Sequence, residues 1–175
     1  ITEILTANKK DLEGGRGLSA AMQRRLELSE KSIRALATSL RTIKELPDPV
    51  GQIAKTWTRP DGLVISRVRT PIGVIACIFE SRPNIIIDVA ALCLKSGNAL
   101  IVRGGKEAAH SNNAFMALIK QAITTAGLPE YAVQQLEDRR YEAINELVQL
   151  EDYLDLVIPR GREELIRAVS AHAHV

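Results

Sequence analysis

Three segments of the sequence combine cations with glycine or proline directly after short apolar runs. They are residues 80–84 (ESRPN), 103–106 (RGGK) and 159–162 (PRGR). In a parallel sheet the carboxyl ends of all strands meet at one edge, and open α/β sheets bind their ligands there. Backbone amides of glycine-bearing loops and helix starts, together with cationic side chains, suit an anion such as a phosphate. The sequence therefore predicts an anion site at one edge of a sheet.

The pattern from residue 71 onward predicts the sheet that would bring these segments together. The apolar run at 72–79 is typical of a strand buried on both faces. Further strands are expected at 99–103, 132–136 and 154–158, with helices at 85–96, 107–126, 139–150 and 162–173. Short connections in this alternation favour right-handed crossovers, with helices on both faces of a parallel sheet. We therefore expect an α/β fold whose Rossmann-like core spans residues 71–175.

The first 52 residues are expected to form helices that belong to the same domain as the Rossmann-like core. One helix is expected at 1–12, and a second begins at the N-cap candidate Ser29 and ends before Pro47. The glycine cluster at 14–17 (GGRG) follows a helix rather than a strand, so a flexible connector is favoured over a phosphate loop.

Residues 53–70 have a different pattern, which predicts a β-hairpin. Apolar and β-branched residues flank Pro60, Asp61 and Gly62. Proline presets φ and glycine accepts positive φ, so this is a turn sequence. An appended two-stranded ribbon is marginally stable alone. We therefore expect the hairpin to pair with another part of the protein or with another subunit.

Composition excludes several classes of function. The chain has 46% hydrophobic residues, 3% aromatic residues and a net charge of +2. Aromatic stacking platforms and basic stripes are not evident, so nucleic acid is not expected as a partner. No apolar run reaches the ~20 residues of a membrane span, and a signal peptide is not apparent. These features predict a cytoplasmic protein that does not insert into membranes.

The thiols and imidazoles do not form a metal-binding pattern. Cys77 and Cys93 have no CxxC spacing, and His110, His172 and His174 do not combine with them into a zinc motif. Both cysteines lie in apolar surroundings, which favours inert core thiols over nucleophiles. We predict no metal.

Four motifs together resemble the γ-glutamyl phosphate reductase family. They are residues 79–84 (FESRPN), 94–99 (LKSGNA), 103–108 (RGGKEA) and 155–161 (DLVIPRG), and the resemblance extends over essentially the whole chain. This family belongs to the aldehyde dehydrogenase superfamily. The superfamily binds its dinucleotide without GxGxxG, a fingerprint whose absence here disfavours an ordinary Rossmann dehydrogenase. In the superfamily a hairpin like that at 53–70 serves oligomerisation.

The resemblance implies a reaction and its partners. The family reduces L-glutamyl 5-phosphate to L-glutamate 5-semialdehyde with NADPH, releasing phosphate, in proline biosynthesis. A cysteine thiolate would displace phosphate, and an oxyanion hole would stabilise the tetrahedral intermediates. The implied partners are the small-molecule substrate, NADPH/NADP, a second copy of the chain through the hairpin, and glutamate 5-kinase.

Matching the motifs residue by residue implies site roles. Asn84 or Ser81 would be a polar donor near the reacting carbonyl, and Arg82 would contact an anion. The residues implied to hold the nucleotide ribose or its 2′-phosphate are Arg103, Gly104, Gly105 and Lys106. Those implied to lie near the pyrophosphate are Pro159, Arg160 and Gly161.

The family's nucleophilic cysteine lies downstream of the matched region, and neither Cys77 nor Cys93 occupies its place. The chain begins at Ile1 without methionine and ends just after a helical pattern. We therefore expect a cofactor-binding portion that lacks the catalytic domain and does not turn over alone. Two alternatives remain: the reductase half of a bifunctional pyrroline-5-carboxylate synthase, and a non-catalytic nucleotide-binding α/β module.

Overall fold

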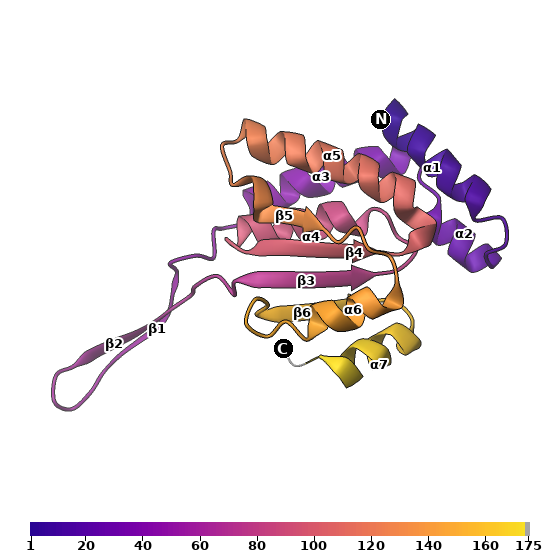
Figure 1. The fold of residues 1–175 in the computed structure, drawn as a ribbon. Coiled ribbons are helices and arrows are strands. Elements are labelled where there is room, and N and C mark those ends of the chain that lie inside the picture. The colour runs from indigo at the N-terminus through magenta and orange to yellow at the C-terminus, as the bar shows by residue number, and fades with distance from the viewer. Residues whose placement is uncertain (174–175) are drawn as a thin grey trace.

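Four parallel strands form the central sheet of the computed structural model, which describes residues 1–173 (Figure 1). The order across the sheet is β5-β4-β3-β6. The strands are β3 (Val74–Phe79), β4 (Ala99–Gly104), β5 (Val133–Gln135) and β6 (Leu156–Arg160). This order confirms the predicted fold class. His174 and the last residue of the predicted core lie outside the described residues.

Helices cover both faces of the sheet because the strand residues alternate between apolar clusters on its two faces. Cys77 and Phe79 of β3 pack with α4 (Ile85–Lys95) and α5 (Ala109–Thr125). Ile78 points the other way and packs against α6 (Tyr141–Val148) and α7 (Glu163–His172). With neighbours on both edges and both faces, five of the six β3 residues are buried, as the unbroken apolar run predicted.

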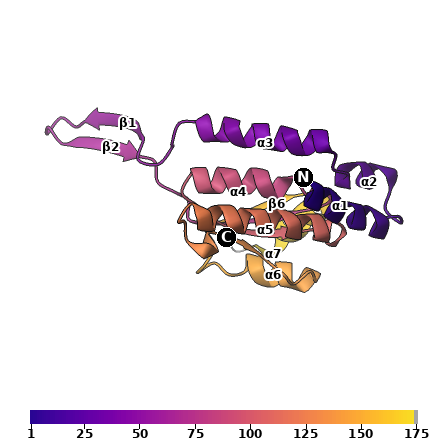
Figure 2. The same ribbon diagram turned by 90° about the horizontal axis from the view of Figure 1, so that it is seen from above.

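The N-terminal helices lie on the same side of the sheet as α4 and α5; the last of them covers α4, and the others lie toward one end of this layer (Figure 2). They are α1 (Thr2–Gly14), α2 (Ala20–Leu26) and α3 (Glu30–Glu45). Ser29 caps α3 as predicted, in a reciprocal pair of hydrogen bonds with Ser32. The short helix α2 was not predicted separately. It begins at Ser19, whose hydroxyl accepts from the amide of Met22 at 3.3 Å.

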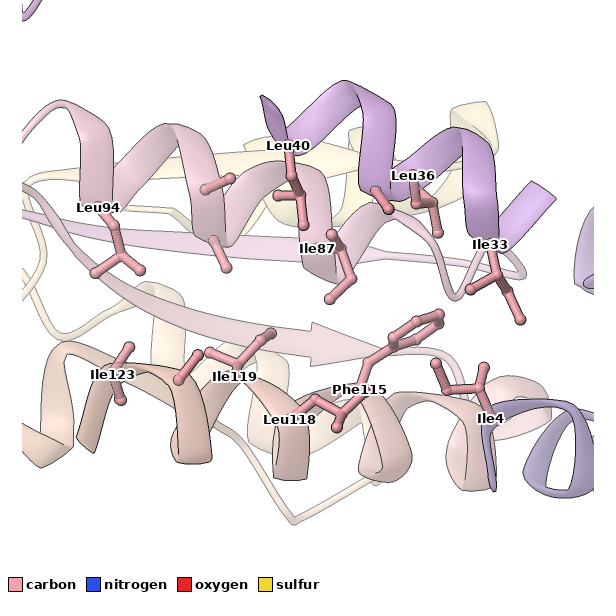
Figure 3. A pocket seen from close by; sticks show the side chains of 14 residues that line it. Ile4, Ile33, Leu36, Leu40, Ile87, Leu94, Phe115, Leu118, Ile119 and Ile123 are labelled. Carbon is pink, nitrogen blue, oxygen red and sulfur yellow. The ribbon is translucent and has the colours of Figure 1, made fainter. Parts of the chain in front are cut away.

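An apolar pocket of about 370 Å³ lies between α3, α4 and α5 (Figure 3). Leu36 and Leu40 of α3 face Phe115 and Ile119 of α5 across it. The layers in Figure 2 show α3 lying outside α4. The pocket therefore separates part of α3 from α5.

Strand β6 differs from the prediction by two residues. It was expected at 154–158 and runs from Leu156 to Arg160, so Pro159 and Arg160 belong to the strand rather than to the loop. Within residues 1–173 β6 pairs only with β3, which makes it an edge strand. A proline that cannot donate to a ladder is tolerated at such an edge.

Strands β1 (Ile53–Thr58) and β2 (Val64–Val68) form the predicted hairpin. Gly62 has φ of 88°, a conformation that a side chain would strain. The hairpin projects from the body of the molecule as an arm (Figures 1 and 2).

No helix within residues 1–173 combines the length and the apolar character needed to cross a bilayer.

A buried asparagine joins the outer helices to the core. The Asn8 amide donates to the Leu26 carbonyl at 2.8 Å and to Ser111 Oγ at 3.1 Å. Its carbonyl oxygen accepts from the Leu28 amide at 2.9 Å. Asn8 is only 2% exposed, so these contacts satisfy backbone groups that water does not reach. Asn8 therefore fixes the positions of α1, α2 and α5 relative to one another.

We expect Asn8→Ala to lower the free energy of unfolding by about 2–4 kcal/mol, because it leaves buried backbone groups of Leu26 and Leu28 unpaired. Urea denaturation followed by circular dichroism measures the change. Lys9→Ala, at an exposed neighbouring position of the same helix, is the control. Equal stabilities for the two variants would contradict the assigned role of Asn8.

Candidate functional site

The ends of β3, β4 and β6 lie side by side, as the sequence predicted. Phe79, the last residue of β3, is in register with Gly104 of β4 and with Arg160 of β6. All three chemically distinctive segments therefore leave the sheet at its carboxyl edge. The side chains that follow are nevertheless divided between two cavities.

The first cavity, called here the arginine cavity, lies between the end of β3 and the end of β6 and has a volume of about 220 Å³. Residues from α2 complete it, which the sequence analysis did not anticipate. It is lined by Met22, Arg25, Glu80, Ser81, Arg82, Ile85, Arg160, Gly161 and Arg162. Ser81 and Arg82 of one predicted site loop are thus brought together with Arg160 and Gly161 of the other, whereas Asn84 and Pro159 do not line this cavity.

Positive charge dominates the arginine cavity. Glu80 is its single carboxylate, and it pairs with Arg162 at 3.3 Å. Within residues 1–173, no ion pair engages Arg25, Arg82 or Arg160. Guanidinium groups form strong, often bidentate hydrogen bonds with phosphate and carboxylate. The cavity is suited to a small oxyanion.

Glu80 also occupies the start of α7. Its Oε2 accepts from the backbone amide of Arg162 at 3.1 Å. The carboxylate therefore lies at the positive end of the helix, where negative charge is stabilised. The Arg162 amide, which the sequence suggested for a ligand anion, therefore donates to the protein's own Glu80.

Ser81 and Asn84 are the alternative candidates for a polar donor, and their surroundings in the structure differ. Ser81 is buried, has φ of 48°, and donates both its amide and its hydroxyl to Glu107 Oε1 at 2.7 Å. Asn84 is half-buried, and its side chain caps no backbone amide of α4. The Ser81 hydroxyl is therefore committed within the protein, whereas the Asn84 amide is not used as a cap.

Arg103, at the end of β4, is buried rather than presented to solvent. It is 7% exposed, its Nη2 donates to the Arg139 carbonyl at 2.7 Å, and the guanidinium lies 5.9 Å from the Tyr141 ring centre. Burial lowers the pKa of Arg103 from its ordinary value. Its Nε is buried without a hydrogen-bond partner within the described residues. Arg103 thus supports the backbone near Arg139, and Lys106 is the exposed cation of the loop.

A second cavity of about 390 Å³ borders this loop, with Gly14, Gly15, Gly17, Lys10, Lys106 and Arg139 among its lining residues. We call it the glycine-loop cavity. The glycine cluster, interpreted from the sequence as a connector, is held in place because Gln23 Nε2 lies 3.2–3.3 Å from the carbonyl oxygens of Gly15, Arg16 and Leu18. The cavity brings Lys10 of α1 and Arg139 of the loop after β5 to the same space as Lys106, a juxtaposition that spacing along the sequence does not reveal. Two carboxylates, those of Asp11 and Glu107, also line it.

The two thiols lie in the core, as predicted. Cys77 is 1% exposed and Cys93 is 6% exposed. Burial raises the pKa of each thiol to about 11. Neither thiol borders the arginine cavity or the glycine-loop cavity. Among residues 1–173, no group of three or more His, Cys, Asp or Glu side chains is arranged to hold a metal ion.

The parallel sheet with cavities at its carboxyl edge places the chain among the Rossmann-like α/β proteins, which bind their ligands at that edge. The aldehyde dehydrogenase family model matches residues 2–174, and the chain belongs to that family. The γ-glutamyl phosphate reductase of Moorella thermoacetica is 52% identical over 174 residues, and that of Clostridium novyi is 47% identical over 174 residues. Each alignment covers 98% of this chain and 42% of the relative. The chain therefore spans about two fifths of the length of these relatives.

Solved structures agree with this assignment. The crystal structure of γ-glutamyl phosphate reductase from Thermotoga maritima superposes with a TM-score of 0.95 at 41% identity, covering 99% of this chain and 42% of that one. The Saccharomyces cerevisiae enzyme gives 0.92 at 32% identity, covering 99% and 45%. A probable aldehyde dehydrogenase from Listeria monocytogenes, at 17% identity and a TM-score of 0.69, covers 97% and 38% and shares the fold.

We expect Cys77 and Cys93 to resist alkylation by iodoacetamide in the native chain at pH 8. With pKa values of about 11, only about 0.1% of each thiol is ionised at that pH, and burial also blocks access. Reactivity should rise only as the pH approaches 11, since the thiolate is the reacting form. Mass spectrometry should count two modified thiols after denaturation in urea, which serves as the control. Rapid labelling of the folded chain would contradict the assignment as core thiols.

Proposed function

We propose that this chain is the cofactor-binding portion of an NADPH-dependent oxidoreductase that reduces L-glutamyl 5-phosphate to L-glutamate 5-semialdehyde, releasing phosphate, in proline biosynthesis. The observation that carries this proposal is the arginine cavity at the carboxyl edge of the sheet. It supplies cations for a phosphoryl group in a chain whose relatives bear the name γ-glutamyl phosphate reductase. The two free cysteines fit a reducing compartment, which favours the cytoplasm.

The residues at this edge fit a phosphorylated dinucleotide. Arg160 and Gly161 line the arginine cavity and would lie near the pyrophosphate, with Pro159 preceding them in β6. Lys106, with Lys10 and Arg139 in the same cavity, would contact the nucleotide ribose or its 2′-phosphate. Gly104 and Gly105 form the backbone of that loop. NADPH, when bound, supplies the hydride for the reduction.

The substrate would meet residues of the turn after β3. Arg82 is exposed, unpaired within the described residues and part of the arginine cavity, so it would bind the phosphoryl group. Asn84 is the better candidate for the donor to the reacting carbonyl, because the Ser81 hydroxyl already donates to Glu107. An amide donor held near a developing oxyanion stabilises the transition state.

Neither thiol of this chain suits the role of nucleophile, since both are buried and have raised pKa values. We therefore propose that residues 1–175 bind cofactor without turnover. The chain is equally compatible with the reductase half of a bifunctional pyrroline-5-carboxylate synthase, and glutamate 5-kinase remains a proposed partner. The other alternative, a non-catalytic nucleotide-binding module, would bind the nucleotide but not the substrate.

Fluorescence titration of residues 1–175 with NADPH and NADH tests the cofactor assignment. We expect tighter binding of NADPH, and Lys106→Ala should weaken NADPH about five- to tenfold while changing NADH much less, because one phosphate contact is lost. Arg103→Ala should also weaken NADPH, through the loss of its bond to the Arg139 carbonyl. Lys44→Ala, at the far end of α3, is the control. Equal affinity for the two nucleotides in all variants would refute the assigned role of this loop.

The hairpin is proposed to join copies of the chain. Ile53 and Val64 are 64% and 61% exposed, and the arm has little contact with the body, so a partner would cover apolar surface. Replacing residues 53–68 by a Gly-Ser linker should convert the oligomer to a monomer in light scattering while leaving the circular dichroism of the sheet unchanged. Tyr131→Ser, at an exposed aromatic residue elsewhere, is the control. An intact chain that is monomeric, or an oligomer that survives the replacement, would refute the proposal.

A further inference from the structure

Glu107 connects the two ligand loops of the carboxyl edge. It lies in the short 3-10 helix η1 (Lys106–Ala108), directly after Lys106 and the two glycines at the end of β4. Its Oε1 accepts two hydrogen bonds from Ser81, one from the amide and one from the hydroxyl, each at 2.7 Å. A Cβ on Gly105 would lie 2.5 Å from the Glu107 carboxylate, so the glycine leaves the space that this carboxylate fills. Ser81 and Gly105 thus both lie close against the Glu107 carboxylate.

These hydrogen bonds hold Ser81 in a conformation that it would not adopt freely. Its φ of 48° makes it the only residue other than glycine with positive φ within residues 1–173. A side chain in this region is strained, and serine has no strong preference for it. Hydrogen bonds to a carboxylate are among the stronger ones in proteins. The Glu107 carboxylate is therefore the group that stabilises this turn.

The orientation of the turn decides where the next residue lies. On its other side the turn is held by Glu80, which bonds the Arg162 amide and guanidinium. Pro83 is buried and presets its own φ. Between these fixed points, Arg82 is exposed and lines the arginine cavity. Glu107 itself does not line that cavity.

We propose that Glu107 is a positioning residue for oxyanion binding: through Ser81 it holds the Arg82 guanidinium at the arginine cavity. The identity of the oxyanion as the phosphoryl group of the substrate rests on the proposed function. Without the carboxylate, Ser81 relaxes to negative φ, which rotates the peptide bond before Arg82. The guanidinium then leaves the cavity, and oxyanion affinity falls although the sheet remains folded.

Isothermal titration with inorganic phosphate, the product that the proposed reaction releases, measures this role. Glu107→Ala should weaken phosphate about tenfold, roughly the loss of one charge-assisted contact. Glu107→Gln should stay within about twofold, since its carbonyl oxygen can accept the same two hydrogens. Thermal unfolding of each variant reports folding separately. Glu130→Ala, in η2 (Glu130–Ala132) before β5 at the opposite edge of the sheet, is the matched control.

Ser81→Gly provides a second test that does not depend on the stability of Glu107→Ala. Glycine accepts positive φ and keeps the amide bond to Glu107, so phosphate affinity should fall less than in Glu107→Ala. If Glu107 acts through Ser81, the double variant should bind phosphate about as weakly as Glu107→Ala alone, which is strong non-additivity.

The outcomes separate this inference from the proposed function. Phosphate and NADPH binding by the wild type, with weakening in Glu107→Ala and rescue in Glu107→Gln, supports the positioning role. Unchanged phosphate affinity in Glu107→Ala, or additive losses in the double variant, overturns the inference while NADPH binding still supports the function. A wild type that binds neither NADPH nor phosphate overturns both.

Discussion

Carboxylates that bind backbone amides hold the carboxyl edge of the sheet together. Asp11 of α1 accepts from the amides at the start of α5, at 2.9 and 2.7 Å. Glu80 bonds the amide at the start of α7, and Glu107 bonds the amide of Ser81. Each carboxylate belongs to a different segment from the amide that it satisfies. The edge is therefore built from contacts between segments, and the loops depend on one another for their conformation.

This arrangement explains why the edge can carry so much positive charge. The starts of α5 and α7 are each occupied by a carboxylate of the protein itself, so these amides do not contribute to ligand binding and the arginine side chains supply the positive charge for an anion. Arg25, Arg82 and Arg160 remain without acidic partners around the arginine cavity within the described residues. Cations held close together repel one another, and an oxyanion relieves that repulsion. The same geometry that stabilises the loops thus leaves the arginines available to a ligand.

The sequence predicted the sheet, its helices, the hairpin and the shared edge because apolar periodicity and turn residues act locally. It did not predict that Arg25 reaches the site, because α2 is positioned by Asn8, which is distant in sequence. It did not predict that Arg103, whose ligand contact stays a prediction, is buried beside Tyr141 by tertiary packing. It could not distinguish Ser81 from Asn84, since the difference lies in a hydrogen bond to Glu107 across 26 residues. Pairings of this kind leave no periodic signal.

The apolar pocket beneath α3 bears on how the family can vary. Alanines at positions 37, 91 and 122 are among the residues that line this space of about 370 Å³, which is partly open to solvent. Larger apolar residues at these positions would extend into this space, and filling a cavity commonly stabilises a protein by ~0.5–2 kcal/mol. Helices α3, α4 and α5 can therefore accept larger side chains at these positions. The free energy of unfolding gained from bulkier residues there would offset the loss caused by destabilising substitutions elsewhere, including substitutions at the charged edge of the sheet.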